Sequence, residues 1–381
     1  MTPGARASAA IAILDRILAG EPAERALTNW GRASRFAGSG DRAAVRDLVF
    51  DALRQRRSAA ALGGGLTGRG LILGLMRAAG QETLFSGAGH APAPPGPQDQ
   101  GRPPGGAEAL DVPDWLLPEL EASLGSDCSA VLEALRHRAP VFLRVNLRKG
   151  DRMAAIAALA EEGIVAVAHP LASTALEVTA NARRVQTSRA YLSGLVEVQD
   201  ASSQAVVEAL PLADGMRVLD HCAGGGGKTL AMAARADLRL WAHDIAPRRM
   251  ADLPERARRA GVRVTFTDRP ELAAPFDLVL VDAPCSGSGS WRRDPEGKWA
   301  LTPDRLASLV AEQASILARA AAMVARGGIL AYATCSLVRR ENQLQIQTFL
   351  AASAGWRQER ELSLTPISGG DGFFLAVMRR A

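Results

Sequence analysis

The sequence predicts an α/β protein in which an open, mostly parallel sheet forms the C-terminal half, preceded by a small α+β module and an N-terminal helical domain. Three observations lead to this prediction. From about residue 203, strand patterns alternate regularly with helical patterns, as in a series of βαβ units. Between residues 141 and 200, strand and helix patterns alternate on a smaller scale. Before residue 85, apolar residues recur only at helical spacing.

The N-terminal helical prediction depends on two apolar stripes. Ile11, Leu14 and Leu18 fall on one face of a helix, and a second stripe runs through residues 41–57. No strand pattern interrupts residues 1–85, so we expect a small helical domain there.

A change in composition separates this domain from the rest. Residues 86–106 are rich in proline and glycine and nearly free of large apolar side chains, so they cannot bury enough surface to order themselves. We therefore expect a linker at 86–106, a helical and small α+β module over 107–202, and the α/β domain over 203–381.

Composition excludes several classes of protein. Four cysteines lie far apart without a CxxC pair, which argues against a disulfide framework and a zinc site, so we expect no metal and a reducing compartment. No uncharged apolar run is long enough to span a membrane, and the N-terminus lacks the order of a signal peptide. These features predict a cytoplasmic protein that does not bind membranes. The net charge of +5 points to nucleic acid as a partner.

A glycine loop follows the first strand of the α/β domain and opens a helix. Glycines at such a place let the backbone approach a ligand and direct its amide groups toward it. The loop also matches the end of a phosphate-binding P-loop at Gly227, Lys228 and Thr229, but that motif requires glycine where this chain has Cys222. The segment runs through Asp220, His221, Cys222, Ala223, Gly224, Gly225, Gly226, Gly227 and Lys228.

Acidic residues end the neighbouring strands. Asp244 lies 24 residues after Asp220, where an acid commonly accepts hydrogen bonds from ribose hydroxyls. Asp268 closes the third strand, where it can meet an adenine amino group. Carboxylates at successive strand ends suit an adenosine ligand with a cationic sulfonium and repel a triphosphate.

Two cysteines end the fourth and fifth strands of the same series. Cys285 follows Asp282, Ala283 and Pro284, and Cys335 lies in the stretch Thr-Cys-Ser. Both therefore lie at the edge of the sheet where the ligand is expected. Buried structural cysteines have no reason to occupy both places, so we expect a chemical role.

With these motifs, the chain resembles the Sun/Fmu-type family of RNA cytosine-C5 methyltransferases, which modify 16S ribosomal RNA. DHCAGGGGKT, DAPCSGSG, WRRDPEGKW, ATCS, VQDASSQ, ENQ and DGFF carry the resemblance over roughly residues 110–381. The N-terminal third resembles the antitermination-factor-like RNA-binding domain of some members. The chain departs from the family at Gly225, where members usually have proline, and we expect looser cofactor binding as a result.

The resemblance implies a Rossmann-like domain that uses S-adenosylmethionine to methylate carbon 5 of a cytosine in RNA. It implies a monomer acting on 16S rRNA or a small-subunit precursor. In this family Cys335 is the nucleophile that adds to carbon 6 and Cys285 assists its release, while Asp282 and Lys228 are placed to hold the base. The implied cofactor-binding residues are Cys222, Ala223, Gly224, Gly225, Gly226, Gly227, Lys228, Asp244, Arg249, Asp268 and Asp282.

Three alternatives compete with this interpretation. A DNA cytosine methyltransferase takes its nucleophile from a Pro-Cys loop like that of Cys285, and does not require Cys335. A non-catalytic RNA-binding factor does not require the cysteine pair, and a nucleotide triphosphatase does not tolerate Cys222 in its loop. Within the preferred interpretation, Arg292, Arg293 and Lys298 suit phosphate contacts. Residues 1–85 are expected to add RNA affinity without carrying catalysis.

Overall fold

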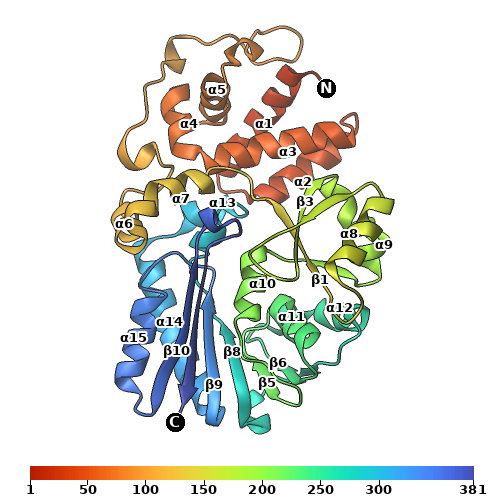
Figure 1. Cartoon of the computed structure of the whole chain (residues 1–381). Coiled ribbons are helices and arrows are strands. Elements are labelled where there is room, and N and C mark those ends of the chain that lie inside the picture. Colours follow the sequence, from red (N-terminus) through yellow and green to blue (C-terminus); the bar gives the residue numbers. More distant parts are fainter. The chain divides into compact units, whose positions relative to one another are not determined.

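The computed structural model describes residues 1–381, which divide into two compact units. The helical unit contains Met1–Arg138 together with Trp291–Ala300. The α/β unit contains Ala139–Ser290 and Leu301–Ala381. Figure 1 shows helices alone in the first unit and two sheets in the second.

The helical unit buries the predicted stripe of residues 41–57, and of the first stripe it buries Leu14 fully and Ile11 and Leu18 partly. Ala10, Leu14, Val45 and Val49 are fully buried in a core that also takes Leu71 to Leu73. Thr2 caps the first helix by accepting a hydrogen bond from the N–H of Ala5. The helices are α1 (Pro3–Leu18), α2 (Ala23–Ala33), α3 (Ser39–Arg54), α4 (Arg56–Gly63), α5 (Gly68–Ala78), α6 (Leu117–Leu124), α7 (Cys128–Leu135) and α13 (Pro295–Ala300).

The stretch expected to be a linker instead lies against the helices of its own unit. Asp99 is 4% exposed, and its carboxylate accepts two hydrogen bonds from Arg69. The N–H of Arg102 donates to the carbonyl of Ala61 at 2.8 Å. Polar contacts thus order residues 86–106 although they bury few apolar side chains. The helical unit also continues to Arg138, past the boundary expected from the change in composition.

The segment after the Cys285 loop also belongs to the helical unit. The indole N–H of Trp299 donates to the carbonyl of Leu53 at 2.7 Å, and Lys298 Nζ donates to the carbonyl of Arg54 at 3.1 Å. Trp291 is 2% exposed, Arg292 5% and Lys298 3%. Burial therefore contradicts the expectation that Arg292 and Lys298 contact phosphate, and only Arg293 is exposed.

The small module of the α/β unit is an antiparallel sheet of order β2-β3-β1-β4. Its strands are β1 (Val141–Val145), β2 (Val165–Ala168), β3 (Ala175–Ala180) and β4 (Val196–Val198), with helices α8 (Arg152–Glu161) and α9 (Arg189–Leu192). Asp151 caps α8 by accepting from the N–H of Ala154 at 2.8 Å, and Leu143, Leu159, Leu176 and Val196 form a fully buried core. The predicted α+β module is present here.

The large sheet has the order β10-β11-β9-β8-β5-β6-β7. Strands β5 to β9 run parallel, and the last two strands of the chain add an antiparallel edge. The bounds are β5 (Arg217–Asp220), β6 (Arg239–Ala242), β7 (Thr265–Phe266), β8 (Phe276–Asp282), β9 (Val324–Thr334), β10 (Trp356–Leu364) and β11 (Phe373–Arg380). Strand order reverses between β5 and β8, which is where open parallel sheets bind ligands.

Helices cover both faces of this sheet (Figure 1). Helices α10 (Ala201–Glu208) and α11 (Gly227–Arg235) pack on one face, against alternate residues of β5, β8, β9 and β11. Helices α14 (Pro303–Ala322) and α15 (Gln343–Ala352) pack on the other. Helix α12 (Leu253–Ala260) follows β6 and packs on α11 residue Leu230. Both faces of the central strands are thus buried, as parallel sheets require.

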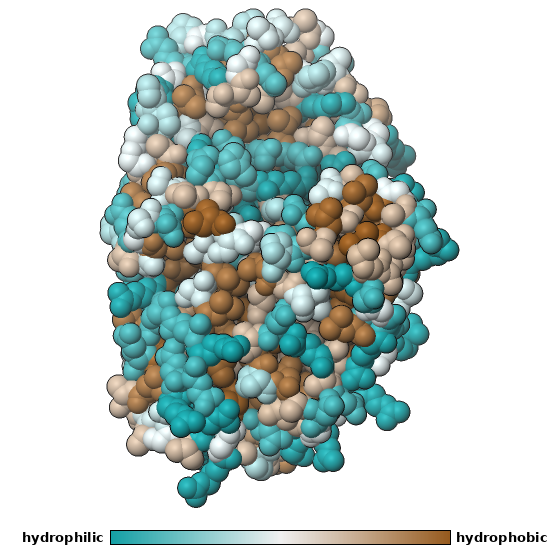
Figure 2. All heavy atoms as spheres, in the orientation of Figure 1, coloured by the Kyte–Doolittle hydropathy of each residue, from teal (hydrophilic) through white to brown (hydrophobic).

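No single helix is both long and apolar enough to cross a membrane. Helices α4 and α5, which meet at an angle of 89°, are together long and apolar enough for a bent membrane span. Residues Leu71 to Leu73 of α5 are, however, fully buried in the helical core. On the face shown in Figure 2, hydrophilic residues surround separate groups of apolar ones.

Candidate active site

The cofactor loop, residues 223–227, is a tight turn between β5 and α11. The N–H of Gly226 donates to the carbonyl of Ala223 at 2.8 Å, which closes the turn. Gly224 has a φ of +49° and Gly226 a φ of +77°, a region that side chains disfavour. A Cβ at Gly226 would lie 2.1 Å from Leu253 of α12. Glycine is therefore needed at position 226 because of its backbone conformation and the close packing of Leu253.

Asp244, which follows β6, holds this loop through hydrogen bonds. Its side chain is 2% exposed, and Oδ2 accepts from the N–H of Gly224 at 2.9 Å and from Arg249 at 3.0 Å. Its other oxygen accepts from the N–H of Ala246 at 2.9 Å. Asp244 thus orders the backbone around the predicted ligand site.

A pocket of about 640 Å³ opens beside the carboxyl ends of β5 and β6. Four of the predicted cofactor residues line it, namely Cys222, Asp244, Arg249 and Asp268. Apolar and aromatic walls complete it through Ile245, Pro247, and the rings of His221 and His243, which stack with centroids 5.0 Å apart. The predicted residues Ala223, Gly224, Gly225, Gly226, Gly227, Lys228 and Asp282 are not part of its lining.

Asp220, at the end of β5, has one buried carboxylate oxygen without a hydrogen-bond partner. One carboxylate oxygen accepts from the hydroxyl of Thr229 at 2.6 Å, and the other is buried without a partner. Burial raises the pKa of Asp220 to about 7, against the opposing effect of Thr229. An unpaired buried oxygen beside the glycine loop suits the polar part of a ligand.

The two predicted cysteines are brought together. Cys285 follows β8 and Cys335 follows β9, and their sulfur atoms lie 3.5 Å apart. A hydrogen bond in which either sulfur can be the donor joins the two thiols, and this bond lowers the pKa of Cys335 against burial and the charge of Asp282. The same bond, together with burial, raises the pKa of Cys285 well above its usual value. Of the pair, Cys335 is therefore the one whose thiolate form is favoured.

Lys228 and Asp282 form an ion pair beside the cysteines. Lys228 Nζ lies 2.7 Å from Asp282 Oδ2 and 4.6 Å from the centre of the Phe373 ring. Burial is the largest single effect on the pKa of Lys228 and lowers it, but the charge and hydrogen bond of Asp282, together with Cys335 and Asp220, raise this pKa overall. The cation of Lys228 in turn helps to lower the pKa of Cys335. The third cysteine of the region, Cys222, has a pKa raised by burial and stays a thiol.

Glu341 joins the two cysteine loops and is fully buried. Its Oε1 accepts from the N–H of Ser286 at 2.8 Å and from Gln313 at 3.0 Å, and its Oε2 accepts from the hydroxyls of Ser286 and Ser336. The next residue, Asn342, donates from its side chain to the carbonyl of Ser336 at 2.8 Å. The carboxylate thus binds the residue that follows each cysteine.

Of the residues that hold these loops, Arg249 is among the predicted cofactor-binding residues, whereas the sequence predicts no role for Arg256 and places Glu341 only within the ENQ motif. The sequence does carry a signal for Arg144 and Glu197, because each is a charged residue inside a short apolar strand pattern. Such a residue is expected to have a buried partner.

Two family models match this chain. The model for "16S rRNA methyltransferase RsmB/F" matches residues 207–378, and a model for the ferredoxin-like domain of RsmF/B-type methyltransferases matches residues 112–186. The ribosomal RNA small subunit methyltransferase B of Xylella fastidiosa is 37% identical over 284 residues, which are 69% of this chain and 66% of that protein. In a second strain the identity is 36%, over 69% of this chain and 67% of that protein. The chain belongs to the RsmB/F family of rRNA methyltransferases.

Membership in the RsmB/F family confirms the resemblance drawn from the motifs. The chain spans about two thirds of the length of the curated relatives it matches and covers 60% of a third relative, from Xanthomonas campestris. The crystal structure of PH0851 matches this chain with a TM-score of 0.79 and 22% sequence identity. The match covers 100% of this chain and 99% of that chain. This likeness and the sheet order confirm the predicted α/β fold with a mostly parallel sheet and a helical N-terminal region.

The cofactor of RsmB/F methyltransferases is S-adenosylmethionine, as predicted, and the pocket suits it. A volume of about 640 Å³ is in the range of small-molecule sites. Carboxylates at Asp244 and Asp268 suit hydroxyl and amino donors, and the apolar wall at Ile245 suits an aromatic ring. The structure contains no group of three or more histidine, cysteine or acidic residues that could hold a metal ion.

Proposed function

We propose that this chain methylates carbon 5 of a cytosine in RNA, most specifically 16S rRNA, through a covalent bond between Cys335 and carbon 6 of the base. The observation that carries the proposal is the cysteine pair, with sulfur atoms 3.5 Å apart at the ends of β8 and β9. A DNA-type enzyme does not require Cys335, whereas an RNA-type enzyme uses both cysteines.

Cys335 starts the reaction. Its lowered pKa favours the thiolate, which adds to carbon 6 and makes carbon 5 nucleophilic. S-adenosylmethionine, when bound, supplies the methyl group on a sulfonium sulfur and leaves as S-adenosylhomocysteine. Carbon 5 then carries both the methyl group and its original proton.

Release requires that this proton leave and that the bond from Cys335 to carbon 6 break. The carbon 5 proton passes to a solvent base, its electron pair restores the ring double bond, and the bond to carbon 6 breaks so that Cys335 leaves as a thiolate. Cys285, whose sulfur lies 3.5 Å from that of Cys335, assists by donating a hydrogen bond to the departing thiolate. Asp282, held by Lys228, is placed to accept a hydrogen bond from the amino edge of cytosine. Because a duplex hides carbon 6 within the stacked bases, the target must be single-stranded or flipped out.

The cofactor roles proposed here follow from the loop and pocket. Asp244, Asp268 and Arg249 line the pocket expected to take the adenosine part, and residues 222–228 carry the loop beside it. We further propose that the protein acts as a monomer in the cytoplasm and that residues 1–85 contribute to RNA binding.

The test uses S-adenosylmethionine labelled in its methyl group, with unmodified 16S rRNA, assembling small subunits and duplex DNA as separate substrates. Bisulfite sequencing of the labelled RNA should locate 5-methylcytosine at one position. Label transfer to DNA alone, or to an RNA position other than carbon 5 of cytosine, would overturn the proposal.

A further inference from the structure

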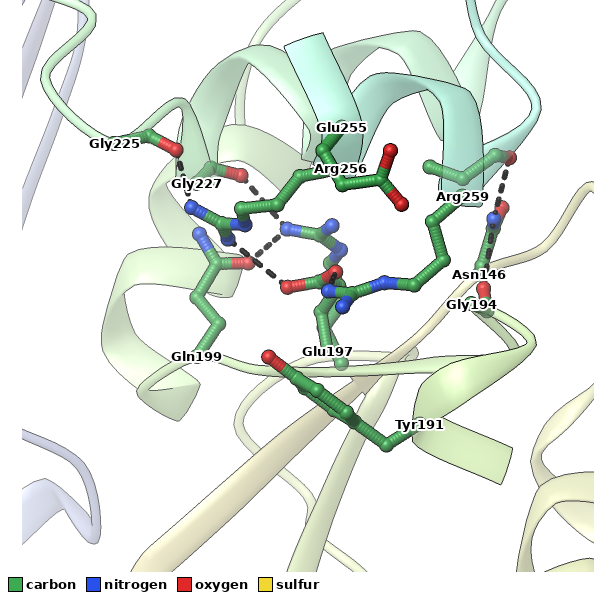
Figure 3. Close-up of polar contacts among 12 residues, drawn as sticks. Asn146, Tyr191, Gly194, Glu197, Gln199, Gly225, Gly227, Glu255, Arg256 and Arg259 are labelled. Atoms are coloured by element: carbon green, nitrogen blue, oxygen red, sulfur yellow. Dashed lines mark hydrogen bonds and ion pairs between the residues drawn. The ribbon is translucent and has the colours of Figure 1, made fainter. Parts of the chain in front are cut away.

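A cluster of charged residues, two of them buried and two half-buried, connects the small module to the cofactor loop (Figure 3). We call Arg144, Glu197, Arg256 and Arg259 the arginine cluster. Glu197 of β4 is 3% exposed, and its carboxylate binds Arg256 at 2.9 Å through one oxygen and Arg259 through the other. Arg144 of β1 donates to Gln199 and, at 2.7 Å, to the carbonyl of Gly227.

Arg256 reaches from this cluster to the loop itself. One of its nitrogens binds Glu197 and another donates to the carbonyl of Gly225, as Figure 3 shows. The peptide unit that joins Gly225 to Gly226 is therefore held at both ends, because its N–H donates to Ala223 at 2.8 Å. Fixing both ends of one peptide plane fixes the direction of the turn.

The composition of the loop explains why such a contact matters. Gly224 to Gly227 are four consecutive glycines, and ordering glycine costs more backbone entropy than ordering any other residue. At Gly225 the backbone itself gives no reason for glycine, since its φ is not positive and its N–H makes no hydrogen bond. The nearest atom to a Cβ there is Arg256 Nη1, at 3.3 Å.

We propose that Arg256, oriented by Glu197, is a positioning residue that holds the cofactor loop in its binding conformation in place of local backbone rigidity. A planar guanidinium fixed by a buried carboxylate is already oriented, so little side-chain entropy is lost when it binds the loop. Arg144 holds the next carbonyl along, at Gly227. Arg256 lies on α12 and Arg144 on β1, so neither contact comes from a strand of the large sheet.

The decisive experiment compares Arg256→Met with Arg258→Met, since Arg258 lies on the same helix, is paired to Glu255 and is 76% exposed. Arg256→Met should weaken S-adenosylmethionine binding about tenfold by calorimetry and raise its KM equally, with kcat at saturation unchanged. Arg258→Met should leave both within twofold of wild type. Glu197→Gln should fall between the two.

Rescue by proline separates positioning from general stability. Gly225→Pro should restore most of the affinity lost in Arg256→Met, because proline fixes φ near −65° and Gly224 has no Cβ to clash with its ring. In the wild-type background, where Arg256 already holds the loop, the same change should raise cofactor affinity by a smaller factor than it does in Arg256→Met. A lack of rescue, or equal affinities for Arg256→Met and Arg258→Met, would overturn the proposal.

The inference rests on the proposed function for its ligand, so a second measurement is needed that does not use S-adenosylmethionine. Hydrogen exchange of the Gly226 amide should speed up about tenfold in Arg256→Met and stay unchanged in Arg258→Met. If wild type fails to bind S-adenosylmethionine, the proposed function is wrong, and the exchange rates still judge Arg256. Unchanged exchange in Arg256→Met rejects its positioning role whatever the ligand.

Discussion

The two parts of the candidate site are held in place by different kinds of contact. The cofactor loop is held by two ion-paired side chains: Asp244, paired with Arg249, accepts from the N–H of Gly224, and Arg256, paired with Glu197, donates to the carbonyl of Gly225. The cysteine loops are held by Glu341, whose partners are hydroxyl, amide and backbone groups. The difference follows what each region must do.

A charge near a thiol changes its pKa whether or not it also holds the backbone. At the cysteines, Glu341 with neutral partners fixes the loops, while Lys228 and Asp282 act on the pKa of Cys335 in opposite directions. Glu341 also raises the pKa of Cys285, so holding and tuning are separate only for Cys335. At the glycine loop no residue needs a tuned pKa, so strong charge-assisted hydrogen bonds can order the backbone directly.

The largest expected effect is at the cysteines themselves. Cys335→Ala cannot form the bond to carbon 6, so it should be inactive and leave no covalent complex. Cys285→Ala can add and transfer methyl but should stall before elimination, so enzyme should remain bonded to methylated RNA. A denaturing gel with labelled RNA distinguishes them, and a shifted band for Cys335→Ala alone would reverse the assigned roles.

Removing residues 1–106 should affect the cysteine loops and leave the cofactor loop unchanged. Residues 291–300 follow the Cys285 loop and lose Leu53 and Arg54 as hydrogen-bond partners, whereas the contacts of the cofactor loop described above all lie within the α/β unit. We therefore expect S-adenosylmethionine affinity within about twofold of wild type and a turnover number reduced by about a hundredfold or more. This differs from the sequence-based expectation that the N-terminal region adds only RNA affinity. Full turnover at saturating RNA would restore the earlier view.

Glu341→Gln keeps the shape of the side chain and removes its charge. Hydrogen bonds to charged groups contribute about 1.5–3 kcal/mol each, so loosening the cysteine loops should lower kcat by about 10- to 100-fold. Cofactor affinity should stay within about twofold, opposite to the pattern for Arg256→Met. The exposed carboxylate Glu255, changed to Gln, serves as the control. Equal losses in kcat and cofactor affinity would show that the two loops are not held separately.

Asp244→Ala tests the charged side of the comparison. Losing hydrogen bonds to the proposed ribose hydroxyls should cost about 1.5–3 kcal/mol each in cofactor binding, and Gly224 loses its anchor as well. Binding of RNA should be nearly unchanged. Calorimetry that finds the wild-type affinity for S-adenosylmethionine would remove Asp244 from the site.

The smallest effect concerns stability and contrasts the two most buried lysines. Lys228 is paired with Asp282, whereas Lys298 donates only to a backbone carbonyl, and burial lowers its pKa to about 7. Between pH 7 and the unfolded pKa of about 10.5, the unfolded chain binds more protons, so stability should rise with pH by up to about 1.4 kcal/mol per pH unit. Lys298→Met should abolish that rise in denaturant titrations at pH 7 and 9. A rise that persists in Lys298→Met would assign it to another group.

Much of the site could be predicted from the sequence because its signals are local. The glycine loop, the acids after successive strands and the two cysteines each follow a short apolar strand pattern. In a parallel sheet all such strand ends meet at one edge. The structure accordingly places Cys285 beside Cys335, and Asp282 beside Lys228.

Tertiary structure alone decided how these residues are held. Arg256 meets Glu197 from 59 positions away, and Glu341 meets Ser286 from 55, and neither separation leaves a periodic signal in the sequence. The same holds for Lys298, which the motif suggested for phosphate but which is buried against Arg54, 244 positions away. Strand and loop positions follow from hydrophobic patterning and backbone chemistry, whereas the partner of a buried charge depends on which distant segments the fold brings together.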